Sequence, residues 1–228
     1  MLLLIIGVLF LGLMFVPQFW VKFVMRRYHR QDPAIPGTGG ELAQHLIERF
    51  QLEGIGVEQT QEGGDHFDPN DRMVRLSPGN YKGRSLTAVA VAAHEVGHAI
   101  QFHRGEPIFE LRKKYIPRAV LFNKIGVAMM MSIPFAGLIL RSPVAIGVVI
   151  AAAILLQIMG AMAYLIILPE EWDASFNKAL PILKKGEYID RKQEGAVRQV
   201  LRAAALTYFA AALANIFNIG RWLMVLRR

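Results

Sequence analysis

The sequence predicts a mainly α-helical membrane protein, with three to four transmembrane helices and a small α+β domain that a transmembrane hairpin splits in two. Hydrophobic residues make up 54% of the 228 residues, and the mean hydropathy of +0.33 is high for a soluble protein. The apolar residues gather in a few long runs, and the stretches between them have helical or strand periodicity. This distribution favours a membrane protein over a soluble globular domain.

The first apolar run covers residues 1–20 and consists almost entirely of Leu, Ile, Val, Phe, Gly and Met. Four basic residues follow it: Lys22, Arg26, Arg27 and Arg30. A secretory signal peptide has the reverse order, with positive charge before the apolar run and small residues after it. We therefore expect an uncleaved transmembrane anchor at residues 1–21.

The second clear run, residues 144–168, is interrupted only by Gln157 and Tyr164 and exceeds the ~20 residues that cross a bilayer. Residues 125–140 are fewer, but Lys124 at their start can extend its side chain toward the membrane surface. Arg141-Ser142-Pro143 joins the two runs as a tight turn. Residues 116–168 are therefore predicted to form a transmembrane hairpin.

A last apolar run at residues 203–219 contains Thr207, Asn215 and Asn218. These polar residues leave two interpretations open for the C-terminal segment, residues 203–228. It either crosses the bilayer as a further transmembrane helix or lies against other helices at the membrane.

The formal net charge is +8 and the pI is about 9.9. Such a balance is common in nucleic-acid-binding proteins, but here the basic residues cluster at the ends of apolar runs, as the positive-inside rule describes. The rule places residues 22–115 in the cytoplasm, and we expect no nucleic-acid partner. The chain has no Cys, which excludes disulfides and thiolate metal ligands.

The most informative motif is His94-Glu95-Val96-Gly97-His98. Residues 86–100 are apolar almost all round and rich in Ala, which predicts a buried helix. Histidines four residues apart lie on one face of a helix and can bind one zinc ion, and Glu95 beside them can act as a base. The alternative is a pair of core histidines with hydrogen-bond partners, which leaves the adjacent acid unexplained.

Catalytic zinc usually has three protein ligands. A third histidine in the extended motif would stand at position 104, where the chain has Arg104. The other known arrangement takes a Glu from a second helix, and Glu170 and Glu171 follow the predicted hairpin directly. Two crossings return the chain to its original side, so this segment, residues 169–202, can complete a domain begun at residues 22–115. The residues alone leave the choice between the two glutamates open.

Shorter elements precede the motif. We expect a helix over residues 41–51, a strand around Ile55 and Val57, and a polar turn at residues 65–71. Residues 72–77 alternate and predict a second strand. Peptidases often hold a substrate as an additional strand at a sheet edge. The expected substrate-binding edge comprises Arg72, Met73, Val74, Arg75 and Leu76; the alternative is an ordinary interior strand.

Residues 90–101, 65–69, 74–77 and 203–208 resemble the YugP-like family of neutral zinc metallopeptidases. The arrangement is also similar to that of HtpX-type membrane proteases, in which a Glu-aromatic-x-Ala-Asp motif follows a membrane hairpin. The resemblance implies a zincin-like domain of the gluzincin type, one Zn²⁺ per chain, and a multi-pass protein of a bacterial-type inner membrane. It selects Glu171 as the third ligand. Ser175 stands where HtpX-type proteases have Asp, and Asp173 is a candidate to replace that Asp in orienting a ligand histidine.

The working hypothesis is a zinc-dependent endopeptidase that acts on membrane or membrane-proximal proteins. His94, His98 and Glu171 would hold the metal, and Glu95 would take a proton from water. His66 is our choice for a donor to the developing oxyanion, among His66, Arg75, Tyr81 and Tyr208. The alternative is a metal-bearing membrane scaffold without hydrolytic activity, although structural zinc needs no neighbouring base. A transporter is disfavoured because the apolar runs lack buried charges, and the oligomeric state stays open.

Overall fold

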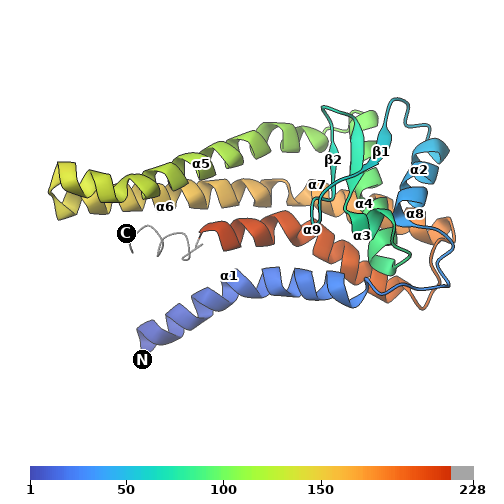
Figure 1. Ribbon diagram of the computed structural model, residues 1–228, viewed down its shortest axis with the longest axis horizontal. Coiled ribbons are helices and arrows are strands. Elements are labelled where there is room, and N and C mark those ends of the chain that lie inside the picture. Colours follow the sequence, from blue (N-terminus) through green and yellow to red (C-terminus); the bar gives the residue numbers. More distant parts are fainter. Residues whose placement is uncertain (217–228) are drawn as a thin grey trace. The chain divides into compact units, whose positions relative to one another are not determined.

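The computed structural model describes residues 1–216, and the side chains of all of these except residues 2–11, 13–14, 136–140 and 211–216 (Figure 1). Most of this part of the chain is helical. It divides into two compact units. The helical unit comprises residues 1–18, 111–167 and those from 208 onward, and the mixed unit comprises residues 19–110 and 168–207.

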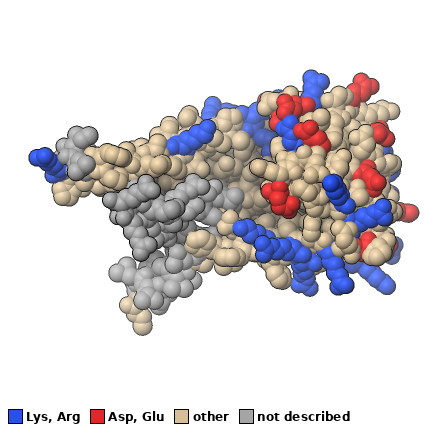
Figure 2. Space-filling model, viewed as in Figure 1, with Lys and Arg blue, Asp and Glu red and all other residues tan. Residues whose placement is uncertain are grey.

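The helical unit contains most of α1 (Leu2–Arg27), nearly all of α5 (Phe109–Leu140), α6 (Pro143–Ile166) and the end of α9 (Glu194–Ile216). Two helical segments, Phe109–Phe135 and Pro143–Lys185, are long and apolar enough to cross a membrane and are mostly unburied. Figure 2 shows few charged residues over α5 and α6, whereas both signs of charge gather over the mixed unit. Two helices among the residues that the structure describes are therefore candidates to span a membrane.

The hairpin of α5 and α6 is joined at Arg141 and Ser142, as expected from the turn residues there. Small residues bring the two helices together. A Cβ on Gly126 would lie 3.0 Å from the carbonyl oxygen of Ala153, and one on Gly160 would lie 3.2 Å from that of Ala119. Helix α5 begins earlier than its apolar run, because residues 109–124 are also helical. Of the last predicted run, residues 203–219, the final three lie outside the described residues.

The mixed unit is built around α4 (Leu86–His103), whose residues from Thr87 to Gln101 are all buried. It starts at Ser85, whose hydroxyl accepts a hydrogen bond from the Ala88 N–H at 3.1 Å. Burial on all sides agrees with the apolar composition of this segment. The surrounding elements of the unit are α2 (Gly39–Arg49), α3 (Pro78–Tyr81), a small sheet, α7 (Leu168–Trp172), the π-helix η1 (Asp173–Ala179), α8 (Leu180–Lys185) and the start of α9.

The sheet has three strands in the order β1-β3-β2. Strand β1 (Gly56–Gln59) runs parallel to β3 (Met73–Leu76), and β2 (His66–Asp68) runs antiparallel to it. Val74 pairs with Val57 on one side and with Phe67 on the other. The strand expected at residues 72–77 is thus present, with Val74 and Leu76 buried.

The prediction that Arg72, Met73, Val74, Arg75 and Leu76 form an exposed substrate-binding edge is wrong, because β3 is the central strand. The error arises at residues 65–71, where we expected only a polar turn. That stretch contains β2, which is three residues long and therefore too short to show an alternating pattern. Its presence uses the backbone groups on the second side of β3, so the edges of this sheet are β1 and β2.

Arg75 ties the three strands together. Its guanidinium donates to Glu58 of β1 at 2.5 Å, to Asp68 of β2 at 2.6 Å, and to Asp71 of the connecting turn at 2.6 Å. A guanidinium held by three carboxylates is not available to bind a developing oxyanion. Arg75 is therefore a structural residue of the sheet.

Helix α2 begins with a capping box that we expect to contribute measurably to stability. The Thr38 hydroxyl accepts from the Glu41 N–H at 3.1 Å, and the Glu41 carboxylate accepts from the Thr38 N–H at 2.7 Å. Thr38→Ala should lower the free energy of unfolding by about 1 kcal/mol, as measured by denaturant titration of the purified protein. Thr60→Ala is the control, because the Thr60 hydroxyl makes no hydrogen bond with the described residues. Equal effects of the two substitutions would contradict the role of the cap.

Candidate metal centre

Two histidines of α4 supply the first two candidate ligand atoms. His94 and His98 lie one turn apart on the same face of the helix, and their Nε2 atoms are 3.3 Å from each other. Both residues are buried. The rings are nearly perpendicular, at an interplanar angle of 79°. This geometry points both nitrogens at one position beside the helix, as the four-residue spacing predicts.

Glu171 of α7 supplies the third candidate atom. Its Oε2 lies 3.3 Å from the Nε2 of His94 and 3.3 Å from the Nε2 of His98. The ligand atoms of these three residues all lie within 4.8 Å of one another, so one metal ion can reach all three. Helices α5 and α6 lie between His98 and Glu171 in the sequence, and the two side chains nevertheless meet at this site.

The acidic side chains of this site are buried. Glu95, Glu170 and Glu171 are only 7%, 0% and 1% exposed. A divalent cation between His94, His98 and Glu171 would add a positive charge next to these carboxylates and would favour their ionised form.

Glu95 lies between the two histidines in the sequence and shares their buried surroundings. Burial raises the pKa of its carboxyl group. The neighbouring His94 and His98 act in the opposite direction, whereas the charges of Glu171 and Asp65 raise this pKa further. The carboxylate of Glu95 therefore has the electrostatic environment of a proton acceptor close to the metal position.

The outer nitrogen of His94 is held by Ser175 of η1. The Ser175 hydroxyl lies 3.0 Å from His94 Nδ1 and donates to the carbonyl oxygen of Leu201 at 3.1 Å. Because the hydroxyl proton is used by Leu201, the serine oxygen accepts from His94 Nδ1–H. The proton is then on Nδ1, and the lone pair of Nε2 faces the metal position. Ser175 thus orients His94 although it replaces the Asp of HtpX-type proteases.

The outer nitrogen of His98 faces two oxygen atoms. His98 Nδ1 lies 2.8 Å from Glu170 Oε1 and 2.9 Å from Gln101 Oε1. Both are acceptors, so this ring also carries its proton on Nδ1 and leaves Nε2 free for a metal. Both histidines therefore have the tautomer that a metal ligand requires.

Gln101 is in turn held by groups that fix the direction of its amide. Its Nε2 donates to the carbonyl oxygen of Glu170 at 3.0 Å and to Asp173 Oδ2 at 2.9 Å. Asp173 also pairs with Lys178, whose ammonium lies 2.7 Å from Glu106. The expectation that Asp173 orients a histidine is thus met only indirectly, through Gln101. Sequence reasoning did not identify Glu170, Gln101 or Lys178 in these positions.

Gly97 allows η1 to approach α4 closely enough for these contacts. A Cβ at this position would lie 2.8 Å from the carbonyl oxygen of Ala174, which is closer than real Cβ atoms come to backbone. Ala174 is the residue before Ser175, in a π-helix of seven residues. Such wide helical turns are rare and occur mostly at functional sites. Glycine within the motif therefore has a packing reason that the spacing of the histidines did not reveal.

His66 is on the edge strand β2. Its Nδ1–H donates to the carbonyl oxygen of Gly64 at 2.7 Å. His66 does not belong to the group that could hold a metal. Of the other candidate oxyanion donors, Tyr81 packs against Gly40, and Tyr208 stacks on Tyr164 with ring centroids 6.1 Å apart.

Asp65, directly before β2, is a residue that sequence reasoning described only as part of a turn. It accepts hydrogen bonds from the Ser77 N–H at 2.7 Å and from the Asn80 side chain at 3.0 Å. Its charge also raises the pKa of Glu95. Asp65 thus fixes the start of the edge strand to the segment that leads into α4.

A buried helix that carries two histidines and an acid, with a glutamate from a second helix, is the arrangement of a zinc-peptidase centre. The chain belongs to the family described as "Putative neutral zinc metallopeptidase", whose model matches residues 2–227. It is 37% identical over 219 residues to the protein named "Putative membrane protease YugP" of Bacillus subtilis (strain 168), covering 94% of this chain and 92% of that protein. No solved structure shows significant similarity to the chain.

The different positions of Glu170 and Glu171 give a direct test of the ligand set. We expect Glu171→Gln to lose stoichiometric zinc, because it removes the charged ligand oxygen. Glu170→Gln should retain zinc but bind it roughly tenfold more weakly, since it alters a group that orients His98 and removes no ligand oxygen. Zinc content and affinity of the two purified variants measure this difference. Retention of full affinity by Glu171→Gln would contradict the proposed ligand set.

The close approach at Gly97 can be tested separately. Gly97→Ala should push Ala174 and Ser175 away from α4 and destabilise the protein by about 1–3 kcal/mol, with weaker zinc binding. Gly195→Ala is the matched control, because a Cβ there meets nothing within 4 Å. Thermal unfolding with and without zinc separates the two effects. If both substitutions leave zinc affinity and stability unchanged, the approach of η1 does not position the site.

Proposed function

We propose that this protein is a membrane-anchored zinc-dependent endopeptidase that hydrolyses peptide bonds of membrane or membrane-proximal proteins. The observation that carries the proposal is the buried group of His94, His98 and Glu171, with ligand atoms within 4.8 Å of one another. The carboxylate of Glu95, in the same buried environment, adds a base that a purely structural metal site does not need.

The residues divide the chemistry between them. The two histidine Nε2 atoms and the Glu171 carboxylate would hold one Zn²⁺ per chain. When bound, the ion would polarise the scissile carbonyl and lower the pKa of water. Glu95 takes the proton from the attacking water and returns it to the leaving amine. Ser175, Glu170 and Gln101 keep the histidines in the required tautomer.

Strand β2 is the better candidate for binding substrate now that β3 is known to be central. Its pairing partner is β3, and its outer side has no strand partner among the described residues. An extended peptide could add to this edge through backbone hydrogen bonds, which tolerate many sequences. His66 lies on β2, so the proposal keeps it as the donor to the oxyanion, while Arg75 is withdrawn from that role.

The membrane part of the proposal rests on the apolar helices and on the relative named as a membrane protease. We propose a multi-pass protein of the inner membrane, with α1 as an uncleaved anchor and the mixed unit in the cytoplasm. In this arrangement α1, α5 and α6 cross the bilayer, and the C-terminal segment is either a fourth crossing or a membrane-associated helix. Substrates would then reach the metal centre at the membrane surface.

The decisive experiment removes the base without touching the ligands. Glu95→Gln should retain zinc but lose roughly 10²–10⁴-fold in turnover of casein by the detergent-solubilised protein. Glu53→Gln makes the same change on an exposed acid and should behave as the parent protein. Equal turnover by Glu95→Gln and the parent would exclude this mechanism. Zinc binding without chelator-sensitive cleavage by the parent would instead favour a metal-bearing scaffold.

A further inference from the structure

A cavity of the mixed unit is lined by none of the candidate metal ligands and has no part in the proposed hydrolysis. Its volume is about 330 Å³, which is in the range of sites for small organic molecules. It is formed where α2, α4 and α8 end beside η1. The lining residues that matter here are four cations and two apolar side chains: Arg49, Arg104, Lys178, Lys185, Phe50 and Ile182.

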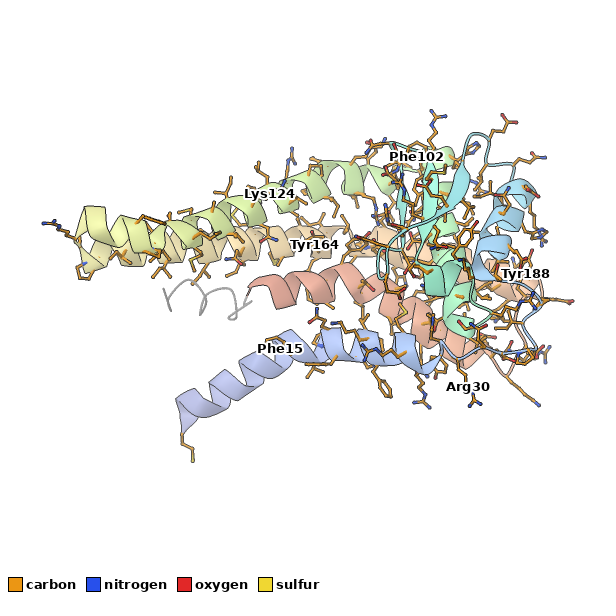
Figure 3. The ribbon with its side chains drawn as sticks, viewed as in Figure 1. Phe15, Arg30, Phe102, Lys124, Tyr164 and Tyr188 are labelled. Atoms are coloured by element: carbon orange, nitrogen blue, oxygen red, sulfur yellow. The ribbon has the colours of Figure 1, made fainter. Side chains whose placement is uncertain are left out.

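The lining of this cavity is strongly one-sided in charge. It includes no Asp or Glu. Lys178 pairs with Glu106 and Asp173, which are not part of the lining, so the like charges that repel one another are those of Arg49, Arg104 and Lys185. Arg49 donates to the hydroxyl of Tyr188 at 2.9 Å. Tyr188, which is labelled in Figure 3, is a neutral partner and does not compensate the charge of Arg49. Arg104 and Lys185 are exposed and form no ion pair with the residues that the structure describes. An anion in the cavity would relieve this repulsion.

Helix dipoles explain part of the pattern. Arg49 and Lys185 lie in the last turns of α2 and α8, and Arg104 follows the last residue of α4. A positive charge near a helix C-terminus is favourable for each helix by itself. The helix dipoles do not explain why three basic C-terminal ends face the same cavity. They also do not explain why that cavity has apolar side chains in its walls. The convergence therefore needs a further reason.

We propose that this cavity binds a small organic phosphate. The guanidinium of Arg104 can donate two parallel hydrogen bonds to a phosphate, and Lys185 adds a second charge. A phosphate monoester carries close to two negative charges, which matches several cations better than a single carboxylate does. Phe50 and Ile182 offer apolar surface to the organic part. Either a soluble phosphomonoester or the headgroup of an anionic lipid has this chemistry.

The cavity is connected to the metal centre through Lys178. Its ammonium pairs with Asp173, which accepts from Gln101, and Gln101 Oε1 lies 2.9 Å from the outer nitrogen of His98. A phosphate beside Lys178 competes with Asp173 for the ammonium group. This competition changes the position of the Asp173 carboxylate, which accepts the hydrogen bond from Gln101. Binding of phosphate and of metal are then coupled, and each changes the affinity for the other. This second step rests on the proposed zinc site, whereas phosphate binding itself does not.

The first experiment measures binding of phenyl phosphate to the full chain, purified with zinc in a neutral detergent, by isothermal titration calorimetry. We expect saturable binding that the double variant Arg104→Gln/Lys185→Gln weakens by about tenfold or more, since two charge-assisted contacts are lost. Arg191→Gln/Lys192→Gln is the matched control, because it removes one Arg and one Lys outside the cavity and should bind as the parent does. Absence of saturable binding, or equal loss in both double variants, would overturn the proposal.

Two further experiments identify the source of the phosphate and test its effect on zinc binding. Protein in phosphatidylcholine nanodiscs is titrated with phenyl phosphate, with and without phosphatidic acid in the bilayer. Competition by phosphatidic acid supports a lipid headgroup as the source, and its absence supports a soluble phosphate. Release of zinc to a chelator should change about fivefold or more at saturating phenyl phosphate. An unchanged release rate, with binding intact, would overturn the coupling alone, while absence of zinc from the parent would count against the proposed function.

Discussion

The constraint on which the site depends is the convergence of Glu171 with His94 and His98 at one position beside α4. The ligand atoms of the three residues lie within 4.8 Å of one another, and all three residues are buried. Glu95 and Glu170 are also buried. A divalent cation held by His94, His98 and Glu171 would favour the ionised form of these carboxylates, so metal binding and folding of the mixed unit are expected to be linked.

The fold satisfies this constraint by bringing a distant segment against one buried helix. Gly97 removes the side chain that would hold η1 away from α4, and the close approach places Ser175 against His94. The residues before η1 then present Glu171 to both histidine Nε2 atoms. The helical unit supplies the intervening hairpin, whose own glycines let α5 and α6 pack closely. Glycine thus allows two close helix contacts, one between α4 and η1 at the site and one between α5 and α6 in the hairpin.

Much of the site could be predicted from the sequence, because the relevant signals are local. The spacing of His94 and His98 fixes their shared face, and the apolar composition of α4 predicts its burial. The choice of Glu171 over Glu170 required the family resemblance, since both acids lie on the same short segment. Strand β2 was missed because three residues are too few to show an alternating pattern. As a consequence, β3 was predicted at the edge of the sheet, whereas it is the central strand. The π-helix and the contacts of Gln101 depend on packing between distant segments, for which a single sequence has no pattern.

Ser175, which departs from the HtpX-type pattern, gives His94 a neutral partner. A carboxylate at position 175 would face His94, whose outer nitrogen here meets a hydroxyl. Glu170 places a carboxylate against the outer nitrogen of the other histidine, His98. One histidine thus has an anionic partner and the other a neutral one. A second anionic partner would strengthen His94 as a ligand but add a further buried charge. The serine therefore keeps the outer nitrogen of His94 hydrogen-bonded without adding that charge.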